Sequence, residues 1–242
     1  MTESYVRIIS IYPTLLGTYG DGGNVLALQH RAGLRNIDVD VHIVAPGDPV
    51  PTDGDLYVLG GGEDTAQVAA ATALRADGGL PKAIGNGAAL LAICAGYQLI
   101  GHEFPDATGK PSPGVGLLDI RTDRLPKRAV GEVVCTPADT APPGIREVLT
   151  GYENHAGATH IGPAAKPLAK VTVGIGNGDG TEGAIAGRII GTYLHGPCLA
   201  RNPAIADQLL GWVTGQDLEP IIEPQVEALR QERLAAARST LS

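Results

Sequence analysis

A cysteine between an apolar strand and a helix is the residue of this chain best placed for covalent chemistry. The apolar run Ala88 to Ile93 predicts a strand, Cys94 follows at once, and a helix is expected from Ala95 to about Gly101. Such a turn exposes the side chain above the carboxyl edge of a sheet, and the positive end of the helix favours a thiolate. A thiolate there can attack a carbonyl carbon, whereas the alternative interpretation is an inert core cysteine.

A nucleophilic thiolate needs a base, and the six histidines of the chain compete for that role. His195 follows the apolar segment Ile189 to Leu194, and an α/β sheet places catalytic groups at the ends of its strands. His155 and His160 lie in a segment that looks irregular and remain rivals. Of the other three, His30 and His42 are expected to be structural, and His102 is expected to end the helix that follows Cys94 and to point away from its N-terminus.

Three consecutive glycines form another candidate part of the site. Gly60, Gly61 and Gly62 follow the strand expected at Asp55 to Leu59. Because glycine lets backbone N–H groups approach a ligand closely, the N–H groups of Gly61 and Ala95 are candidates for an oxyanion hole. The alternative is an ordinary turn between a strand and a helix.

Alternating apolar strands and helices in the first hundred residues predict an α/β fold with a mostly parallel sheet flanked by helices. Asn24 is the expected cap of the first helix. Besides the strand before Cys94, we expect strands at Val6 to Tyr12, Val39 to Val44 and Asp55 to Leu59, and helices at Asn24 to Arg35 and Thr65 to Arg75.

The second half of the chain has a different pattern. Residues 103–143 are rich in proline and glycine and predict a meander at the edge of the sheet. We expect one domain over residues 1–215 and a C-terminal helical extension over residues 216–242, which packs on its own domain or docks a partner. Strands are expected at Val130 to Cys135, Glu147 to Tyr152, Ala169 to Val173 and Gly183 to Leu194, a hairpin turn at Gly174 to Gly180, and helices at Asn202 to Val213 and Glu223 to Ser239.

Composition limits the classes of function. The 242 residues carry a net charge of −8, which disfavours binding to nucleic acid or to an anionic membrane surface. The longest apolar run, Ala88 to Cys94, is far shorter than the roughly 20 residues of a membrane span. With no targeting segment visible, we expect a cytoplasmic protein. Three widely spaced cysteines predict neither a disulfide framework nor a zinc site, and no metal ligands are expected.

Several segments together resemble the triad-type (class I) glutamine amidotransferases. These are Gly60-Gly61-Gly62, Cys94-Ala95-Gly96-Tyr97-Gln98 and Tyr193-Leu194-His195-Gly196. Gly151-Tyr152-Glu153-Asn154-His155 is similar to the branch of the cobyric acid and cobyrinate amidases, and Tyr19-Gly20-Asp21-Gly22-Gly23-Asn24 narrows the resemblance to glutaminase subunits of lipid II isoglutaminyl synthases. The resemblance spans about Tyr5 to Gly196, which identifies the predicted domain of residues 1–215 as an amidotransferase domain.

The resemblance implies a role for each matching residue. Cys94 is the nucleophile that attacks the side-chain amide of L-glutamine, His195 is the general base, and glutamate and ammonia are the products. Arg128 stands where the glutamine-binding arginine is expected, and a guanidinium can hold the α-carboxylate through two hydrogen bonds. Gln98 is expected to contact glutamine as well. The alternative for Arg128 is a solvated arginine on a loop.

The resemblance also implies a partner. The chain has no G-x-x-x-x-G-K-[ST] loop, and no cofactor is expected in it. A Mur-ligase-like synthetase subunit, bound as a heterodimer, would hold ATP, Mg²⁺ and lipid II and activate the α-carboxylate of D-glutamate. Ammonia from this chain would then give D-isoglutamine in peptidoglycan synthesis. The lipid-linked acceptor would bring the complex to the inner face of the membrane.

The acid of the triad departs from the family pattern. Many of these enzymes have His-Pro-Glu, but here Gly-Pro-Cys follows His195 and the next acid is Asp207. Because a catalytic imidazole needs a carboxylate that fixes its tautomer, we hypothesise that the partner supplies one. Glu153 is the candidate within the chain, although its side chain is expected to serve a loop.

Three other functions stay open at this point. The chain could serve another carboxylate acceptor, such as a corrinoid. It could also be a cysteine peptidase-like hydrolase, or another acyl hydrolase, on a similar scaffold. A regulatory protein that kept the fold without the activity is disfavoured by the intact Cys94 and His195.

Overall fold

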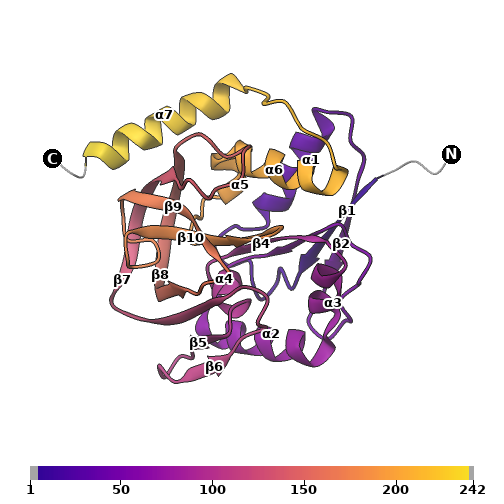
Figure 1. Cartoon of the computed structure of the whole chain (residues 1–242), viewed down its shortest axis with the longest axis vertical. Coiled ribbons are helices and arrows are strands. Elements are labelled where there is room, and N and C mark those ends of the chain that lie inside the picture. Colours follow the sequence, from indigo (N-terminus) through magenta and orange to yellow (C-terminus); the bar gives the residue numbers. More distant parts are fainter. Residues whose placement is uncertain (1–4, 240–242) are drawn as a thin grey trace.

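The computed structural model describes residues 5–239, which form an 11-stranded mixed sheet between two groups of helices (Figure 1). Half of the sheet is parallel. Its strands lie in the order β2 (Val39–Val44), β1 (Val6–Ile11), β3 (Leu56–Leu59), β4 (Ala89–Ile93) and β11 (Ile189–Thr192). The predicted α/β class and the flanked sheet are confirmed.

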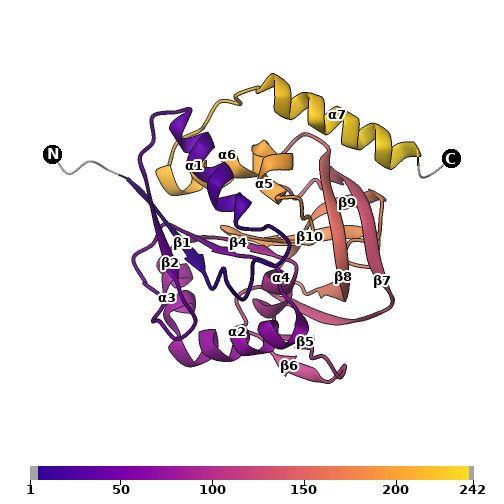
Figure 2. The ribbon, with the colours of Figure 1, turned by 180° about the vertical axis from the view of Figure 1, so that it is seen from behind.

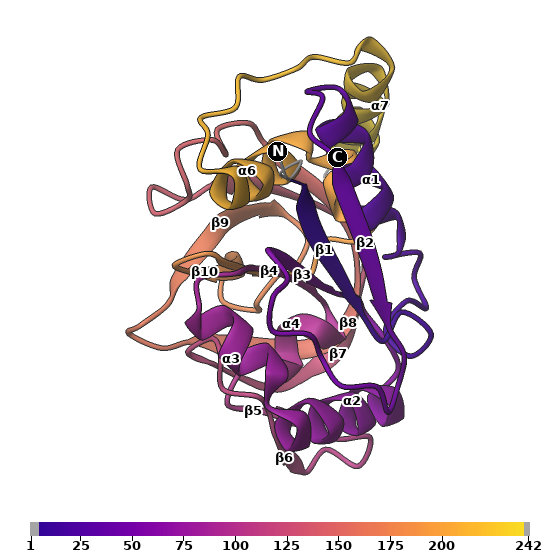
Figure 3. The same cartoon turned by 90° about the vertical axis from the view of Figure 1, so that its right-hand side faces the viewer.

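Helices cover both faces of the parallel strands, which explains their continuous apolar sequences. Every residue of β3 and β4 is buried, as expected for strands enclosed on both sides. Figure 3 shows the two groups of helices on opposite sides of β1, β3 and β4. One group contains α1 (Gly23–Gly33), α5 (Cys198–Arg201) and α6 (Pro203–Thr214), and the other contains α2 (Asp64–Asp77), α3 (Gly79–Gly85) and α4 (Ala95–Leu99).

The other half of the sheet is mostly antiparallel and larger than the expected edge meander. It comprises β10 (Thr181–Ala186), β9 (Lys166–Val173), β7 (Ile120–Pro137) and β8 (Leu149–Ile161), with the hairpin of β5 (Glu103–Pro105) and β6 (Pro111–Pro113) at the sheet's end. The one parallel pairing in this half is that of β5 with β7. The predicted glycine-rich turn joins β9 to β10. Gly174, Gly176, Gly178 and Gly180 all have positive φ, which other residues rarely adopt.

Strand β8 corrects the expectation of an irregular segment around His155 and His160. Both histidines lie within the strand, paired with Ala129 and Arg121 of β7. Buried and more exposed residues alternate along it, but several inward positions are polar or glycine. The alternation of large apolar residues that normally predicts a strand is therefore absent from the sequence.

The C-terminal helix α7 (Pro224–Ser239) confirms the helix predicted at Glu223 to Ser239 and packs on its own domain (Figure 2). Leu234 and Ala237 contact Val134 of β7 in a small apolar cluster. The buried Arg230 donates hydrogen bonds to the carbonyl oxygens of Arg201 and Val148. The division of the chain at residue 215 stays a prediction.

One detail of α1 differs from the sequence-based expectation. Asn24 does not cap the helix, which begins at Gly23. It is buried, and its side-chain oxygen accepts the Leu199 N–H at 2.9 Å, which ties α1 to α5. Helix α3 was not predicted at all. Among residues 5–239, no helix is long and apolar enough to cross a membrane.

Candidate functional site

Cys94 occupies the sharp turn between β4 and α4 that its sequence predicts. It has a φ of 53°, one of the few positive values at a non-glycine residue among the described residues, and its side chain is nearly buried. A Cβ at Gly96 would lie 2.9 Å from the Gly60 carbonyl oxygen, so a side chain is excluded there. The crowding comes from the end of the neighbouring β3. The Gly96 N–H also donates to the Gly60 oxygen at 3.1 Å.

His195 meets Cys94 because their strands are neighbours. Strand β11 pairs in parallel with β4, so the residues that follow both strands share one edge of the sheet. A Cβ built on Gly61 would lie 2.8 Å from His195 Cε1 and 3.3 Å from Cys94 Cβ, which places both side chains against this glycine. Backbone hydrogen bonds in both directions hold His195 to Tyr152 of β8, at 3.0 and 3.1 Å.

The two rival histidines have other surroundings. His155 lines the pocket in front of Cys94, but its ring is stacked on Tyr193 at 3.6 Å between centroids, and its Nδ1 lies 3.0 Å from the Gly157 carbonyl oxygen. His160 is exposed and faces Asp123. The structure therefore brings His195, and neither rival, to the junction of Cys94 and Gly61.

Asp21 is the carboxylate that sequence reasoning missed. Its Oδ1 lies 3.1 Å from His195 Nδ1, and its Oδ2 accepts the Gly61 N–H at 2.7 Å. The residue is 1% exposed. The expectation that this chain lacks an acid beside His195 is therefore wrong. The sequence feature that could have indicated this acid is its place in the loop after β1. It lies within the segment from Tyr19 to Asn24, which served above only for the family resemblance.

Glu153 does not reach His195. Its carboxylate accepts the N–H groups of Ile175 at 2.8 Å and Gly176 at 2.9 Å, in the turn between β9 and β10. This confirms that its side chain serves a loop and removes it as the acid for His195.

The surroundings of His195 favour its protonated form. Burial by itself lowers its pKa, but the hydrogen bond with Asp21 and the nearby Cys94 outweigh burial and raise the pKa to about 10. Its Nε2 is buried and has no hydrogen-bond partner among the described residues. That nitrogen is the one left for a reacting group, because Asp21 occupies Nδ1.

The expected oxyanion hole needs one correction. The Gly61 N–H points to Asp21, so it cannot also bind an oxyanion. Gly62 and Ala95 both line the pocket beside Cys94, whereas Gly61 does not. The Gly62 N–H donates no hydrogen bond within residues 5–239, which leaves it with Ala95 as the available pair of donors.

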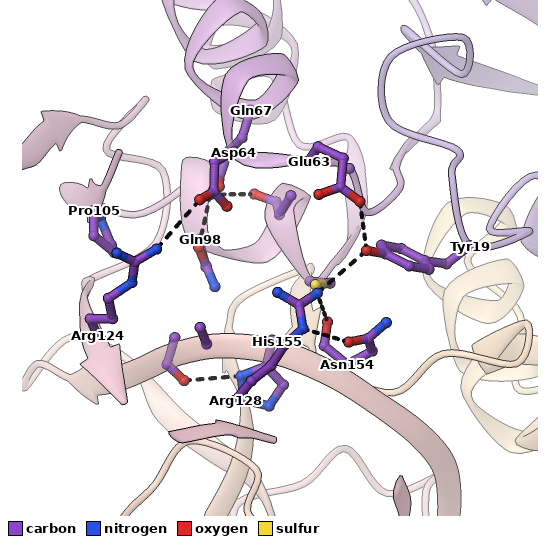
Figure 4. A pocket seen from close by; sticks show the side chains of 15 residues that line it. Tyr19, Glu63, Asp64, Gln67, Gln98, Pro105, Arg124, Arg128, Asn154 and His155 are labelled. Atoms are coloured by element: carbon purple, nitrogen blue, oxygen red, sulfur yellow. Dashed lines mark hydrogen bonds and ion pairs between the residues drawn. The ribbon is translucent and has the colours of Figure 1, made fainter. Parts of the chain in front are cut away.

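Arg128 reaches the same pocket from a bulge in β7 (Figure 4). The pairing of β7 with β8 is interrupted between Arg124 and Ala129, which frees the segment from regular register. Arg128 Nε donates to Asn154 Oδ1 at 2.7 Å, and its Nη2 lies 3.4 Å from the Tyr19 hydroxyl. The guanidinium is therefore oriented into the pocket while it stays exposed to a ligand.

Gln98 also lines the pocket, as part of a chain of buried hydrogen bonds. Its Oε1 accepts from Gln67 Nε2 at 2.9 Å, and its Nε2 donates to the Tyr193 hydroxyl at 3.1 Å. That hydroxyl lies 2.7 Å from Thr159 Oγ1. These contacts fix the orientation of the Gln98 amide in the pocket wall.

Comparison with known proteins finds two similar proteins that carry the same name. A Staphylococcus aureus protein named subunit GatD of the glutamine-hydrolysing lipid II isoglutaminyl synthase is 37% identical over 199 residues, which are 81% of this chain and 79% of that protein. The protein of the same name from Streptococcus pneumoniae is 33% identical over 223 residues, covering 88% of this chain and 84% of the relative.

Similarity of fold extends to solved structures. The crystal structure of a glutamine amidotransferase from Thermotoga maritima matches with a TM-score of 0.57 and 15% identity, over 98% of this chain and 97% of that one. The CobB/CobQ-like glutamine amidotransferase domain matches residues 7–203, which include Asp21, Cys94 and His195. The chain therefore belongs to the CobB/CobQ-like glutamine amidotransferase family.

Proposed function

We propose that this chain is a glutaminase subunit in which Cys94, His195 and Asp21 hydrolyse L-glutamine to glutamate and ammonia. The observation that carries the proposal is the convergence of these three side chains behind a pocket that also presents Arg128. Family membership supports the choice of glutamine as substrate.

The first half of the reaction uses His195 as an acid. With a pKa of about 10, His195 is protonated at neutral pH, and the nucleophile is the thiolate form of Cys94. The sulfur attacks the amide carbon, and the N–H groups of Ala95 and Gly62 stabilise the oxygen as it becomes negative. Nε2 of His195 then protonates the amide nitrogen, the C–N bond breaks, and ammonia leaves.

The second half reverses the role of His195. The imidazole, now neutral, takes a proton from water, and the resulting hydroxide attacks the thioester carbon. The C–S bond breaks and restores the thiolate, while the product acid loses its proton to solvent. Asp21 orients the ring through its contact with Nδ1 and stabilises the positive form of the imidazole.

We further propose that the ammonia serves an ATP-dependent partner of the Mur-ligase type, which holds ATP, Mg²⁺ and lipid II and amidates the D-glutamate of lipid II. The names of the two GatD relatives support this acceptor, and the family leaves another carboxylate acceptor as the alternative. The complex would work in the cytoplasm, at the inner face of the membrane. Co-purification with such a synthetase, and amidation of lipid II by the pair, tests this assignment.

Cys94→Ala is expected to abolish ammonia release from glutamine, because no other described thiol stands at a strand-to-helix turn in the pocket. Cys135→Ala and Cys198→Ala are the controls and should keep most of the rate, since both thiols are fully buried and burial raises their pKa well above the usual range. Coupled glutamate detection gives the rate. Normal turnover by Cys94→Ala would contradict the proposed function.

Arg128→Ala is expected to lower kcat/KM for glutamine roughly 10- to 150-fold, the equivalent of about 1.5–3 kcal/mol for a charged hydrogen bond to the α-carboxylate. Lys127→Ala, which removes the exposed neighbouring charge, is the matched control. A loss of less than about threefold in kcat/KM for Arg128→Ala would show that Arg128 is a solvated arginine and does not bind the α-carboxylate.

The pKa of His195 gives a test of the Asp21 contact. Removing the carboxylate charge in Asp21→Asn should lower that pKa from about 10, measured by imidazole NMR with His195→Gln to identify the resonance. Because the folded pKa lies above the ordinary value of 6.5, the pair's contribution to stability is fully present below pH 6.5 and is lost as the pH rises through 10. The difference in unfolding free energy between the wild type and Asp21→Asn should shrink over that range. An unchanged pKa would refute the contact.

A further inference from the structure

Two charges of opposite sign in the pocket lack ion-pair partners. Among residues 5–239, neither the Arg128 guanidinium nor the Glu63 carboxylate takes part in an ion pair. The Tyr19 hydroxyl lies between them, donating to Glu63 Oε1 at 2.9 Å and lying 3.4 Å from Arg128 Nη2 (Figure 4). The next acid along the wall, Asp64, differs because it pairs with Arg124 at 3.6 Å.

Glu63 is placed to face a ligand. It is the residue directly before α2, its backbone is extended, and its side chain makes no hydrogen bond that caps the helix. The N-terminus of a helix carries a partial positive charge of about one half. The negative charge of Glu63, which has no ion-pair partner among residues 5–239, exceeds it, so this part of the wall is negative. On the facing wall, Arg128 in the bulge of β7 supplies the positive charge, since Arg124 before the bulge is paired with Asp64.

A free α-amino acid carries the complementary pair of charges on adjacent groups. With the α-carboxylate on Arg128, the α-ammonium needs an acceptor on the other side of Tyr19. Glu63 is the ionised acceptor available there without breaking an existing ion pair. The Tyr19 hydroxyl keeps its proton at neutral pH, because burial and the hydrogen bond to Glu63 raise its pKa.

We propose that Glu63 binds the α-ammonium group of glutamine and so selects free glutamine over amides that lack this group. This inference rests on the proposed glutaminase function. It makes Glu63 a specificity residue that contributes to binding of the substrate, while the chemistry stays with Cys94 and His195.

The test compares L-glutamine with glutaramate, the same molecule without the α-amino group. The full chain carrying Glu63→Gln should lose about tenfold or more of its preference for glutamine in kcat/KM, as expected when a charged hydrogen-bond partner is removed. The loss should fall mainly on KM, and turnover of glutaramate should hardly change. Glu63→Asp, which keeps the charge, should retain part of the preference. Glu232→Gln removes an exposed carboxylate on α7 and is the matched control.

The outcomes separate the two proposals. A reduced preference with intact turnover of glutaramate supports the assignment, and equal losses for both substrates would show a structural role and overturn it. An unchanged preference in Glu63→Gln, with a wild type that hydrolyses glutamine, would also overturn it while leaving the glutaminase function standing. Dissociation constants of both compounds can be measured in the inactive Cys94→Ala background, with and without Glu63→Gln. Glu63→Gln should change the preference in binding by the same factor. A wild type that binds and hydrolyses no glutamine would refute the proposed function and this inference with it.

Discussion

The carboxylate of Asp21 holds together two parts of the site that come from different strands. One oxygen contacts His195 Nδ1 at 3.1 Å, and the other accepts the Gly61 N–H at 2.7 Å. Because Asp21 is almost fully buried, its charge would be costly without such partners. The same contacts set the charge of the imidazole and direct the Gly61 N–H away from the pocket. The choice of oxyanion donors and the protonation of His195 both depend on this one side chain.

The order of the parallel strands explains how these residues meet. Strands β1, β3, β4 and β11 are consecutive in the sheet. Asp21, Gly61, Cys94 and His195 follow those four strands in turn, Asp21 through a longer loop. Parallel strands end at the same edge, so residues from far apart in the sequence converge there. The antiparallel strands β7 and β8 then add the wall that carries Arg128 and His155, and α2 adds the opposite wall.

Residues with a local pattern were predictable from the sequence, and residues defined by distant contacts were not. Cys94 follows its strand directly and His195 follows the apolar segment Ile189 to Leu194, and this pattern is visible without a structure. Asp21 lies 174 positions from His195, and no spacing rule connects them. The other oxygen of Asp21 accepts the Gly61 N–H, which made the expectation for that N–H wrong. The full length of β8 was also missed, because its inward positions carry polar groups that find partners only in the folded sheet.

Ammonia release by the purified chain alone, with and without the Asp21 carboxylate, tests the central claim most directly. If Asp21 completes the triad within this chain, the wild type should hydrolyse glutamine without any partner. Asp21→Asn should then lower kcat by up to about 10⁴-fold, the loss seen when a triad aspartate becomes asparagine. A wild-type chain that is inert until a partner contributes a carboxylate, or an Asp21→Asn variant with the wild-type rate, would contradict the account.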